Sequence, residues 1–368
     1  MKNALRFARG LAVSTVLTVS AAFVPSALQA QEVDFSGQTV EWWMPFSEGG
    51  GTDVWARFFA PYLSKYLPGQ PNVIIRNVPG GGSVTGANEF VARARPDGLA
   101  LLGTSGSTQF PYLLGDSRVR YEYADLEPVI VSPTGGVVYI PARFGIADAS
   151  GIDQLVGTEL VYGSQGATSL DLVPLLAFDL LGLNVRHVFG MTGRGDGRLA
   201  FERGEATIDY QTSSAYLTNV EPLVEAGEAV PLFSWGVLDA EGNVQRDPNF
   251  PDLPHFLEVY EMVHGEIDET DVQLQAYLAF FGSGFAAQKP AMLPEGTPPE
   301  IVQAYRQAFI DAIADPDLQA AKGDILGDYE QAVGDQVEGV YRAATTIDPA
   351  AREWVRDFLS ENYQVTLD

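Results

Sequence analysis

Short apolar runs alternate with longer stretches of helical pattern through the first hundred residues. Val40–Met44, Pro71–Arg76 and Leu99–Gly103 have the length and composition of buried strands, and helical patterns start near Thr52 and Thr85. Strands that alternate with helices at this spacing predict a parallel α/β sheet. Ligands of such sheets bind at the carboxyl ends of the strands, so the loops that follow the strands are the first places to search for a site.

The same alternation returns in the second half of the chain. The apolar stretch Leu126–Ile140 is broken by Pro133–Gly136, which predicts that the chain crosses into a second domain there. The polar segment Asp239–Asp271 predicts a long excursion, and Ala279–Phe281 is expected to be the strand that returns to the first domain. Further strands are expected at Leu160–Tyr162, Val185–Phe189, Ala206–Tyr210 and Pro231–Trp235.

The loop after the first strand has the composition of an anion site. Gly49, Gly50 and Gly51 carry no side chain that could block a ligand, and Thr52 and Asp53 are residue types that cap helices. A strand, a bare loop and a capped helix place free backbone N–H groups at a helix N-terminus, where anions bind. An ordinary tight turn without a ligand would have the same composition, and that alternative stays open.

Glycines and small hydroxyl residues also follow the later strands. Thr104–Thr108, Gly163–Ser169 and Gln211–Ser214 each come directly after an expected strand, and Gly190–Gly197 adds one arginine, Arg194. Turns between strands and helices favour these residue types in any protein, so the pattern alone does not require a ligand.

Composition indicates an exported protein with an acidic surface. Residues 1–30 combine a basic start, an apolar core and small residues before Ala30, which predicts a signal peptide that is removed. The formal net charge of −26 disfavours nucleic acid as a partner, and an anionic ligand would need local donors. The chain has no cysteine, which excludes disulfides, thiolate metal sites and catalytic thiols.

Catalytic and cofactor-binding motifs are weak or absent in the sequence. The three histidines, His187, His255 and His264, lack the spacing of metal ligands, and no phosphate-binding or nucleophile-elbow motif occurs. The glycines from Gly80 to Gly86 depart from the dinucleotide-binding pattern. We therefore expect no cofactor and no metal, and a binding protein rather than an enzyme.

The chain resembles a known family. The run formed by Pro45, Phe46, Gly49, Gly50, Asp53 and Arg57 is similar to the opening signature of Bug-type solute-binding proteins, which serve tripartite tricarboxylate transporters. The similarity continues at Asn77–Gly80, Gly86, Ala94–Gly98, Ser164–Gly166, Pro251–Pro254 and Pro290–Pro298. The chain departs from the family at Val188–Gly195 and at Thr168–Leu170, and its segment 239–271 is longer than typical.

The resemblance implies a two-domain α/β clamshell of the type II-like periplasmic-binding-protein class, with the ligand cleft between the domains. We expect domain I at residues 31–132 plus 237–368 and domain II at 133–236. The implied function is capture of a small organic carboxylate in the periplasm, by a monomer, for delivery to the membrane permease subunits of the transporter. A solute sensor that presents its ligand to a receptor, or an enzyme that acts on a small acid, would share most of these features.

The resemblance also implies which residues contact the ligand. For Asp53, the alternative to a ligand contact is a role as helix cap paired with Arg57. The ligand carboxylate is expected at the loop after the first strand, and the second domain is expected to hold the other end of the ligand. For Phe46, the alternative to a ligand contact is a role in the core. The full set is Phe46, Gly49, Gly50, Gly51, Thr52, Asp53, Thr104, Ser105, Ser107, Ser164, Gly166, Ala167, Thr168, Tyr210 and Gln211.

Overall fold

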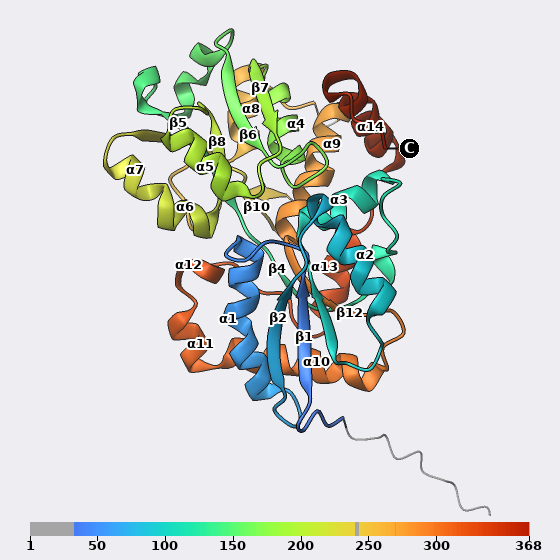
Figure 1. Cartoon of the computed structure of the whole chain (residues 1–368). Coiled ribbons are helices and arrows are strands. Elements are labelled where there is room, and N and C mark those ends of the chain that lie inside the picture. The colour runs from blue at the N-terminus through green and yellow to red at the C-terminus, as the bar shows by residue number, and fades with distance from the viewer. Residues whose placement is uncertain (1–32, 240–242, 269, 368) are drawn as a thin grey trace, which may run out of the picture. The chain divides into compact units, whose positions relative to one another are not determined.

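The computed structural model describes residues 33–239, 243–268 and 270–367 (Figure 1). The predicted signal peptide, residues 1–30, lies outside the described residues. None of the described helices has both the length and the apolar character that crossing a membrane requires.

A five-stranded mixed sheet organises the first lobe. Its order is β2-β1-β3-β12-β4, with β1 parallel to β2 and β3 and with β12 antiparallel to both of its neighbours. The strands are β1 (Thr39–Met44), β2 (Asn72–Asn77), β3 (Ala100–Gly103), β4 (Glu127–Ser132) and β12 (Lys289–Leu293). The helices of this lobe include α1 (Gly51–Tyr66), α2 (Val84–Arg93), α10 (Pro299–Ala314), α11 (Pro316–Ala321), α12 (Gly323–Leu326) and α13 (Gln336–Ala344).

Two adjacent tryptophans on β1 anchor the helices on opposite faces of this sheet, because successive side chains of a strand point to opposite faces. Trp42 packs with its ring centroid 5.2 Å from Trp55 of α1 and 6.1 Å from Phe309 of α10. Trp43 packs 6.0 Å from Phe90 of α2. Helices therefore cover both faces of the sheet. The loops that follow β1 and β3 leave the sheet at the same end.

The second lobe contains an antiparallel sheet, β8-β5-β9, and a parallel pair, β6–β7. Its strands are β5 (Gly136–Pro141), β6 (Leu160–Ser164), β7 (Val185–Phe189), β8 (Asp209–Thr212) and β9 (Ala229–Ser234). Its helices are α4 (Leu172–Leu180), α5 (Arg194–Glu202), α6 (Ser213–Asn219) and α7 (Glu221–Glu225), and α3 (Gly106–Leu114) runs beside it from the end of β3. Short 3-10 helices occur in the chain at Gly81–Ser83, Tyr123–Asp125, Ala142–Phe144 and Ala149–Leu155.

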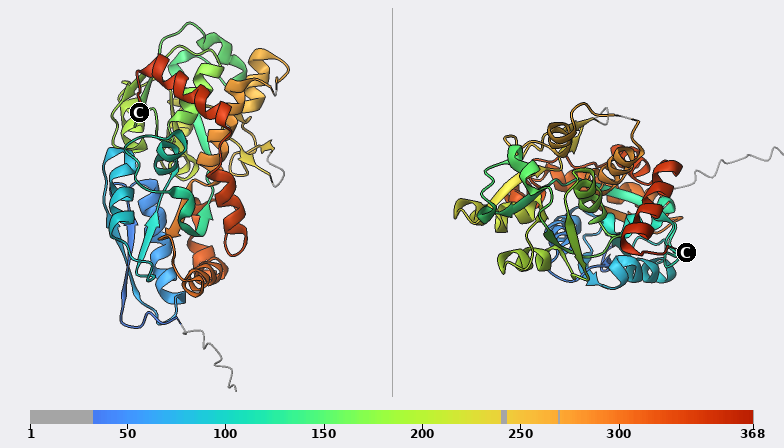
Figure 2. Two further views of the ribbon diagram at one scale, coloured as in Figure 1. Left: turned by 90° about the vertical axis from the view of Figure 1, so that its right-hand side faces the viewer. Right: turned by 90° about the horizontal axis from the view of Figure 1, so that it is seen from above.

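The segment after β9 contributes to both lobes. Helices α8 (Phe256–His264), α9 (Val272–Phe281) and α14 (Pro349–Tyr363) share a hydrophobic core with α4, whereas β12 and α10 complete the first lobe. Figure 2 shows α14 beside α9. The excursion 239–271 includes part of a small hairpin, β10 (Val237–Leu238) with β11 (Val244–Gln245), and helix α8. The domain limits 31–132 plus 237–368 and 133–236 stay a prediction.

One prediction about a strand is wrong. Ala279–Phe281 is the end of helix α9, and a short π-helix at Gly282–Ala286 leads from it to β12, which is the strand that returns. A short apolar run does not distinguish a buried helix from a strand, because both bury every side chain. The parallel arrangement expected for the first three strands is confirmed for β1, β2 and β3, and β12 and β4 extend this sheet through antiparallel pairs.

Candidate functional site

A cleft between the lobes is lined by the loops that follow β1 and β3 on one side and β6, β7 and β8 on the other. It consists of two adjoining hollows of about 480 and 460 Å³. Both hollows are lined by Phe46, Ser47, Ser107, Gln165 and Thr192. The first also reaches the turn Pro79–Ser83, and the second reaches the first turn of α1 and the first turn of α5.

The first turn of α1 faces the second hollow with free backbone donors. Gly49 has a φ of +77°, a conformation that favours glycine, and Gly50 is the N-cap of the helix. The first hydrogen bond of the helix runs from Val54 N to Gly50 O at 2.9 Å. The amides of Gly51 and Thr52 precede that bond and have no partner within the helix, so they are available to an acceptor in the cleft.

Asp53 stabilises this turn through hydrogen bonds to its carboxylate. Its carboxylate accepts hydrogen bonds from Gly49 N at 2.8 Å, from Arg57 Nε at 2.9 Å and from Asn77 Nδ2 at 2.9 Å. Burial opposes ionisation of Asp53, but these donors hold the pKa of the carboxyl below its ordinary value. Asp53 therefore fixes the loop and pairs with Arg57 as expected, but the expected role as helix cap is wrong, because the N-cap of α1 is Gly50 and no side chain caps it.

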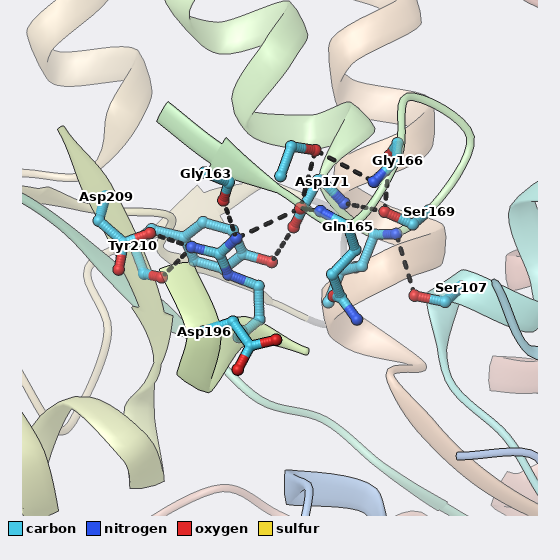
Figure 3. A network of polar contacts seen from close by, with 12 residues as sticks. Ser107, Gly163, Gln165, Gly166, Ser169, Asp171, Asp196, Asp209 and Tyr210 are labelled. Atoms are coloured by element: carbon cyan, nitrogen blue, oxygen red, sulfur yellow. Dashed lines mark hydrogen bonds and ion pairs between the residues drawn. The ribbon is translucent and has the colours of Figure 1, made fainter. Parts of the chain in front are cut away.

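A buried carboxylate organises the loop on the opposite lobe (Figure 3). Asp171 Oδ2 accepts hydrogen bonds from Ser164 Oγ at 3.0 Å and from Gln165 N at 2.7 Å, and Gly166 N donates to Ser164 Oγ at 3.2 Å. Ser169 Oγ closes the loop with a 2.7 Å bond to the carbonyl of Gly166. The backbone of this loop is thus held at the cleft by polar groups that are themselves buried.

Arg194 of the second lobe is already paired with acidic side chains. Arg194 forms ion pairs with Asp171 and Asp209 (Figure 3). Its guanidinium lies over the rings of Tyr162 and Tyr210, at 4.9 and 4.6 Å from their centroids. Burial raises the pKa of the Asp209 carboxyl, and Arg194 opposes that shift. One guanidinium is shared by two carboxylates, so Arg194 brings no unbalanced positive charge to the cleft.

A hydrogen bond joins the second-lobe loop to α3 at the cleft. Leu170 N, on the second-lobe loop, donates to Ser107 Oγ of α3 at 3.2 Å. Ser105 caps α3 by accepting from Ser107 N at 3.2 Å. The hydroxyls that follow β3 therefore both start a helix and contact the opposite lobe.

The structure brings most of the predicted site residues to the cleft and places the others behind it. The predicted residues that line the hollows are Phe46, Gly49, Gly50, Gly51, Thr52, Ser105, Ser107, Gly166, Thr168 and Gln211. Asp53, Thr104, Ser164, Ala167 and Tyr210 are buried and do not line them. Thr104 shares a hydrogen bond with Tyr123, and Tyr210 donates to Asp171. Whether any of these residues contacts a ligand stays a prediction.

Several lining residues were not among the predicted ones. Gln165 and Ser169 lie inside a loop that the sequence did single out, so its glycines and hydroxyls were the signal. Gln288 and Lys289 line the second hollow just before and at the start of β12. They were missed because the returning strand was expected at Ala279–Phe281. Within the described part of the chain, no group of three or more His, Cys, Asp or Glu residues could hold a metal ion.

Comparisons with known proteins agree on one kind of relative. A family model described as "Tripartite tricarboxylate transporter family receptor" matches residues 55–332. Protein BugT of Bordetella pertussis is 26% identical over 309 residues, which cover 82% of this chain and 85% of that protein.

Two solved structures of Rhodopseudomonas palustris proteins share the fold. Rpa4515 with adipate has a TM-score of 0.64 at 20% identity and covers 88% of this chain and 98% of its own. MatC with bound malate has a TM-score of 0.62 at 20% identity and covers 86% and 98%. The two-domain α/β fold expected from the sequence is thereby confirmed.

Proposed function

Because this chain belongs to the family of tripartite tricarboxylate transporter receptors, we propose that it captures a small organic carboxylate between its two lobes. The observation that carries the proposal is the first turn of α1, whose free amides face a hollow of about 460 Å³. Such a helix N-terminus favours a negative charge through both its N–H groups and its dipole. Malate and adipate, which are bound by two proteins of the same fold, are both dicarboxylates.

The proposed carboxylate contacts are the amides of Gly51 and Thr52, with the Thr52 hydroxyl beside them. A hydrogen bond to a charged group contributes about 1.5–3 kcal/mol, and a helix terminus adds about 0.3–1 kcal/mol. Three or four such contacts contribute roughly 5–13 kcal/mol before the cost of ordering the ligand, which is the scale that the roughly 8 kcal/mol of a micromolar complex requires. From the opposite lobe, the loop around Gly166 and Thr168 would hold the other end of the ligand, whereas the side-chain amide of Gln211 already donates to Arg194 O and Asp209.

We also propose that the chain works in the periplasm as a monomer and delivers its ligand to the permease subunits of a transporter. The signal-peptide pattern of residues 1–30 and the family of the chain support this location and partnership. In this proposal the site holds and releases its ligand without covalent chemistry.

A carboxylate panel tests the proposed function. The mature chain is titrated with malate, adipate, citrate and benzoate, and its melting temperature and binding heat are recorded. At least one of these acids should raise the melting temperature and bind in the micromolar range. Adipamide, which has the length of adipate but no charge, serves as the matched control and should give no shift. No response to any acid, or an equal response to adipate and adipamide, would contradict the proposal.

A further inference from the structure

On the second-lobe side, the positively charged side chains that line the second hollow are paired with acidic side chains. Arg194 is paired with Asp171 and Asp209, and Arg198 is paired with Glu202. On the first lobe, the charged residue of the glycine loop is Glu48, an acid. A carboxylate at the first turn of α1 would therefore meet amides and hydroxyls, with no unpaired cation among these groups.

Lys289 lies at the same end of the first sheet as the first turn of α1. It opens β12 and pairs with Ser132 of β4, and the hydroxyl of Ser132 accepts a 2.9 Å hydrogen bond from Trp55 Nε1 of α1. Ala291 and Leu293 belong to the core that β12 shares with Trp55. Because alternate side chains of a strand share a face, Lys289 is on the face that α1 covers. The glycine loop and Lys289 line one hollow.

The ammonium group of Lys289 has no protein partner. The residue is 3% exposed, and no described residue forms a hydrogen bond or ion pair with its side chain. Burial lowers the pKa of Lys289 from 10.5 to about 8, and no neighbouring acid opposes that shift. A buried ammonium without an acid destabilises the protein that carries it, and an apolar residue at this position would not. The arrangement is accounted for if an anion from outside the chain supplies the missing charge.

Gln288 adds a second unpaired polar side chain to the same hollow. It is 5% exposed, and its Oε1 has no hydrogen-bond partner among the described residues. Its side-chain amide also carries two N–H donors. Two consecutive side chains thus place buried polar atoms at the cleft without using them inside the protein.

We propose that Lys289 binds the ligand: its ammonium, assisted by the amide of Gln288, forms an ion pair with a ligand carboxylate and completes the anion site at the first turn of α1. This inference rests on the proposed function and narrows the ligand class. The ligand carries its negative charge at the first-lobe end, and a neutral analogue of the same shape is rejected because it would leave Lys289 buried and unpaired.

Calorimetry on the mature chain tests the role of Lys289, with whichever acid of the panel binds best as the probe. Lys289→Met should weaken binding at least tenfold and should raise the melting temperature of the ligand-free protein. Lys289→Gln is a second variant in case the first folds poorly, and it should weaken binding similarly. Lys322→Met is the matched control, because it removes the same charge outside the cleft, and its affinity should stay within twofold of wild type.

Proton uptake separates an ion pair from a structural role. At pH 8 about half of the buried amines are neutral, so binding of an anion should take up as much as half a proton per complex. Repeating the titration in buffers of different ionisation enthalpy measures this number, and Lys289→Met should abolish it. The other charged groups near the hollow are present in both proteins and cancel in the difference; they are Glu48, Asp53, Arg57, Arg194, Asp196 and Arg198.

The possible failures are distinguishable. If the wild type binds an acid but Lys289→Met binds it within twofold, or if no proton is taken up, the role of Lys289 is wrong and the proposed function stands. If no acid of the panel binds to the wild type, the proposed function and this inference both fall.

Discussion

Arg194 is the residue on which the second-lobe wall depends. It balances two fully buried carboxylates, Asp171 and Asp209, and Asp171 in turn fixes the loop from Ser164 to Ser169. A buried charge that loses its partner costs far more than an exposed one, because water cannot replace the lost interaction. The same residue therefore supports both the stability of the lobe and the shape of the cleft.

Arg194→Met should lower the free energy of unfolding by about 3–5 kcal/mol, since it leaves two buried carboxylates without a cation. Arg198→Met is the matched control four residues further along α5. Its partner Glu202 is partly exposed, so that variant should cost less than about 1 kcal/mol. Urea denaturation at pH 7 measures both values. Equal losses for the two variants would contradict the view that the Arg194 network is the structural centre of this lobe.

His187 makes stability depend on pH. Burial lowers its pKa from 6.5 to about 4, among the rings of Tyr162, Phe178 and Phe189. Between pH 6.5 and 4 the unfolded chain binds a proton that the folded chain does not, so stability is complete above pH 6.5 and is lost as the pH falls through this window. The loss amounts to as much as about 3 kcal/mol.

Substitution of His187 by phenylalanine isolates this effect from the many carboxylates. Acids titrate in both proteins, so the difference in unfolding free energy between His187→Phe and wild type should grow as the pH falls from 6.5 to 4. Chemical denaturation at several pH values in this window measures the difference. A difference that does not change with pH would show that His187 is not buried in its neutral form.

At the scale of elements, the sequence predicted most strands and failed where periodicity carries no information. The strand Val40–Met44 is confirmed closely, because Pro45 marks its end. Ala279–Phe281 was assigned to a strand because α9 is apolar on all sides in this stretch. That single error hid β12, and with it Lys289, from the predicted site.

The candidate cleft could be predicted as a set of loops but not residue by residue. Glycine and hydroxyl residues mark strand ends in the sequence, yet they do not tell whether a side chain faces the cleft or the core. Ser164 shows the difference: its hydroxyl donates to Asp171 and is fully buried, although its loop lines the cleft. Whether the Ser164 side chain faces the cleft or the core depends on its hydrogen bond to Asp171, seven residues away. Only the folded structure shows that bond.

At the scale of the whole molecule, the net charge of −26 opposes the approach of an anion. In the proposed site, the amides of α1 and the ammonium of Lys289 attract a ligand carboxylate at short range. Long-range repulsion is screened by salt, whereas contacts inside a buried site are screened much less.

Added salt should therefore speed the association of malate or adipate, with a smaller effect on dissociation. Stopped-flow fluorescence between about 10 and 150 mM salt, where the Debye length falls from roughly 30 to 8 Å, measures both rates. An association rate that slows with salt would mean that the cleft presents a positive field at long range, contrary to the charge distribution described.

The central claim is that the first turn of α1 holds a carboxylate, and Gly50→Val tests it most directly. Gly50 has a φ of −72°, and a Cβ there would meet Ser47 O at an ordinary 3.6 Å, so the backbone accepts a side chain. The valine would project at the approach to the Gly51 and Thr52 amides. Gly339→Val, in α13 and away from the cleft, is the control for the substitution itself.

Calorimetry with the best-binding acid of the panel should show at least tenfold weaker binding for Gly50→Val and unchanged binding for Gly339→Val. Circular dichroism should show wild-type secondary structure for both variants. Wild-type affinity in a folded Gly50→Val protein would contradict the account and would leave the glycine loop as an ordinary turn between β1 and α1.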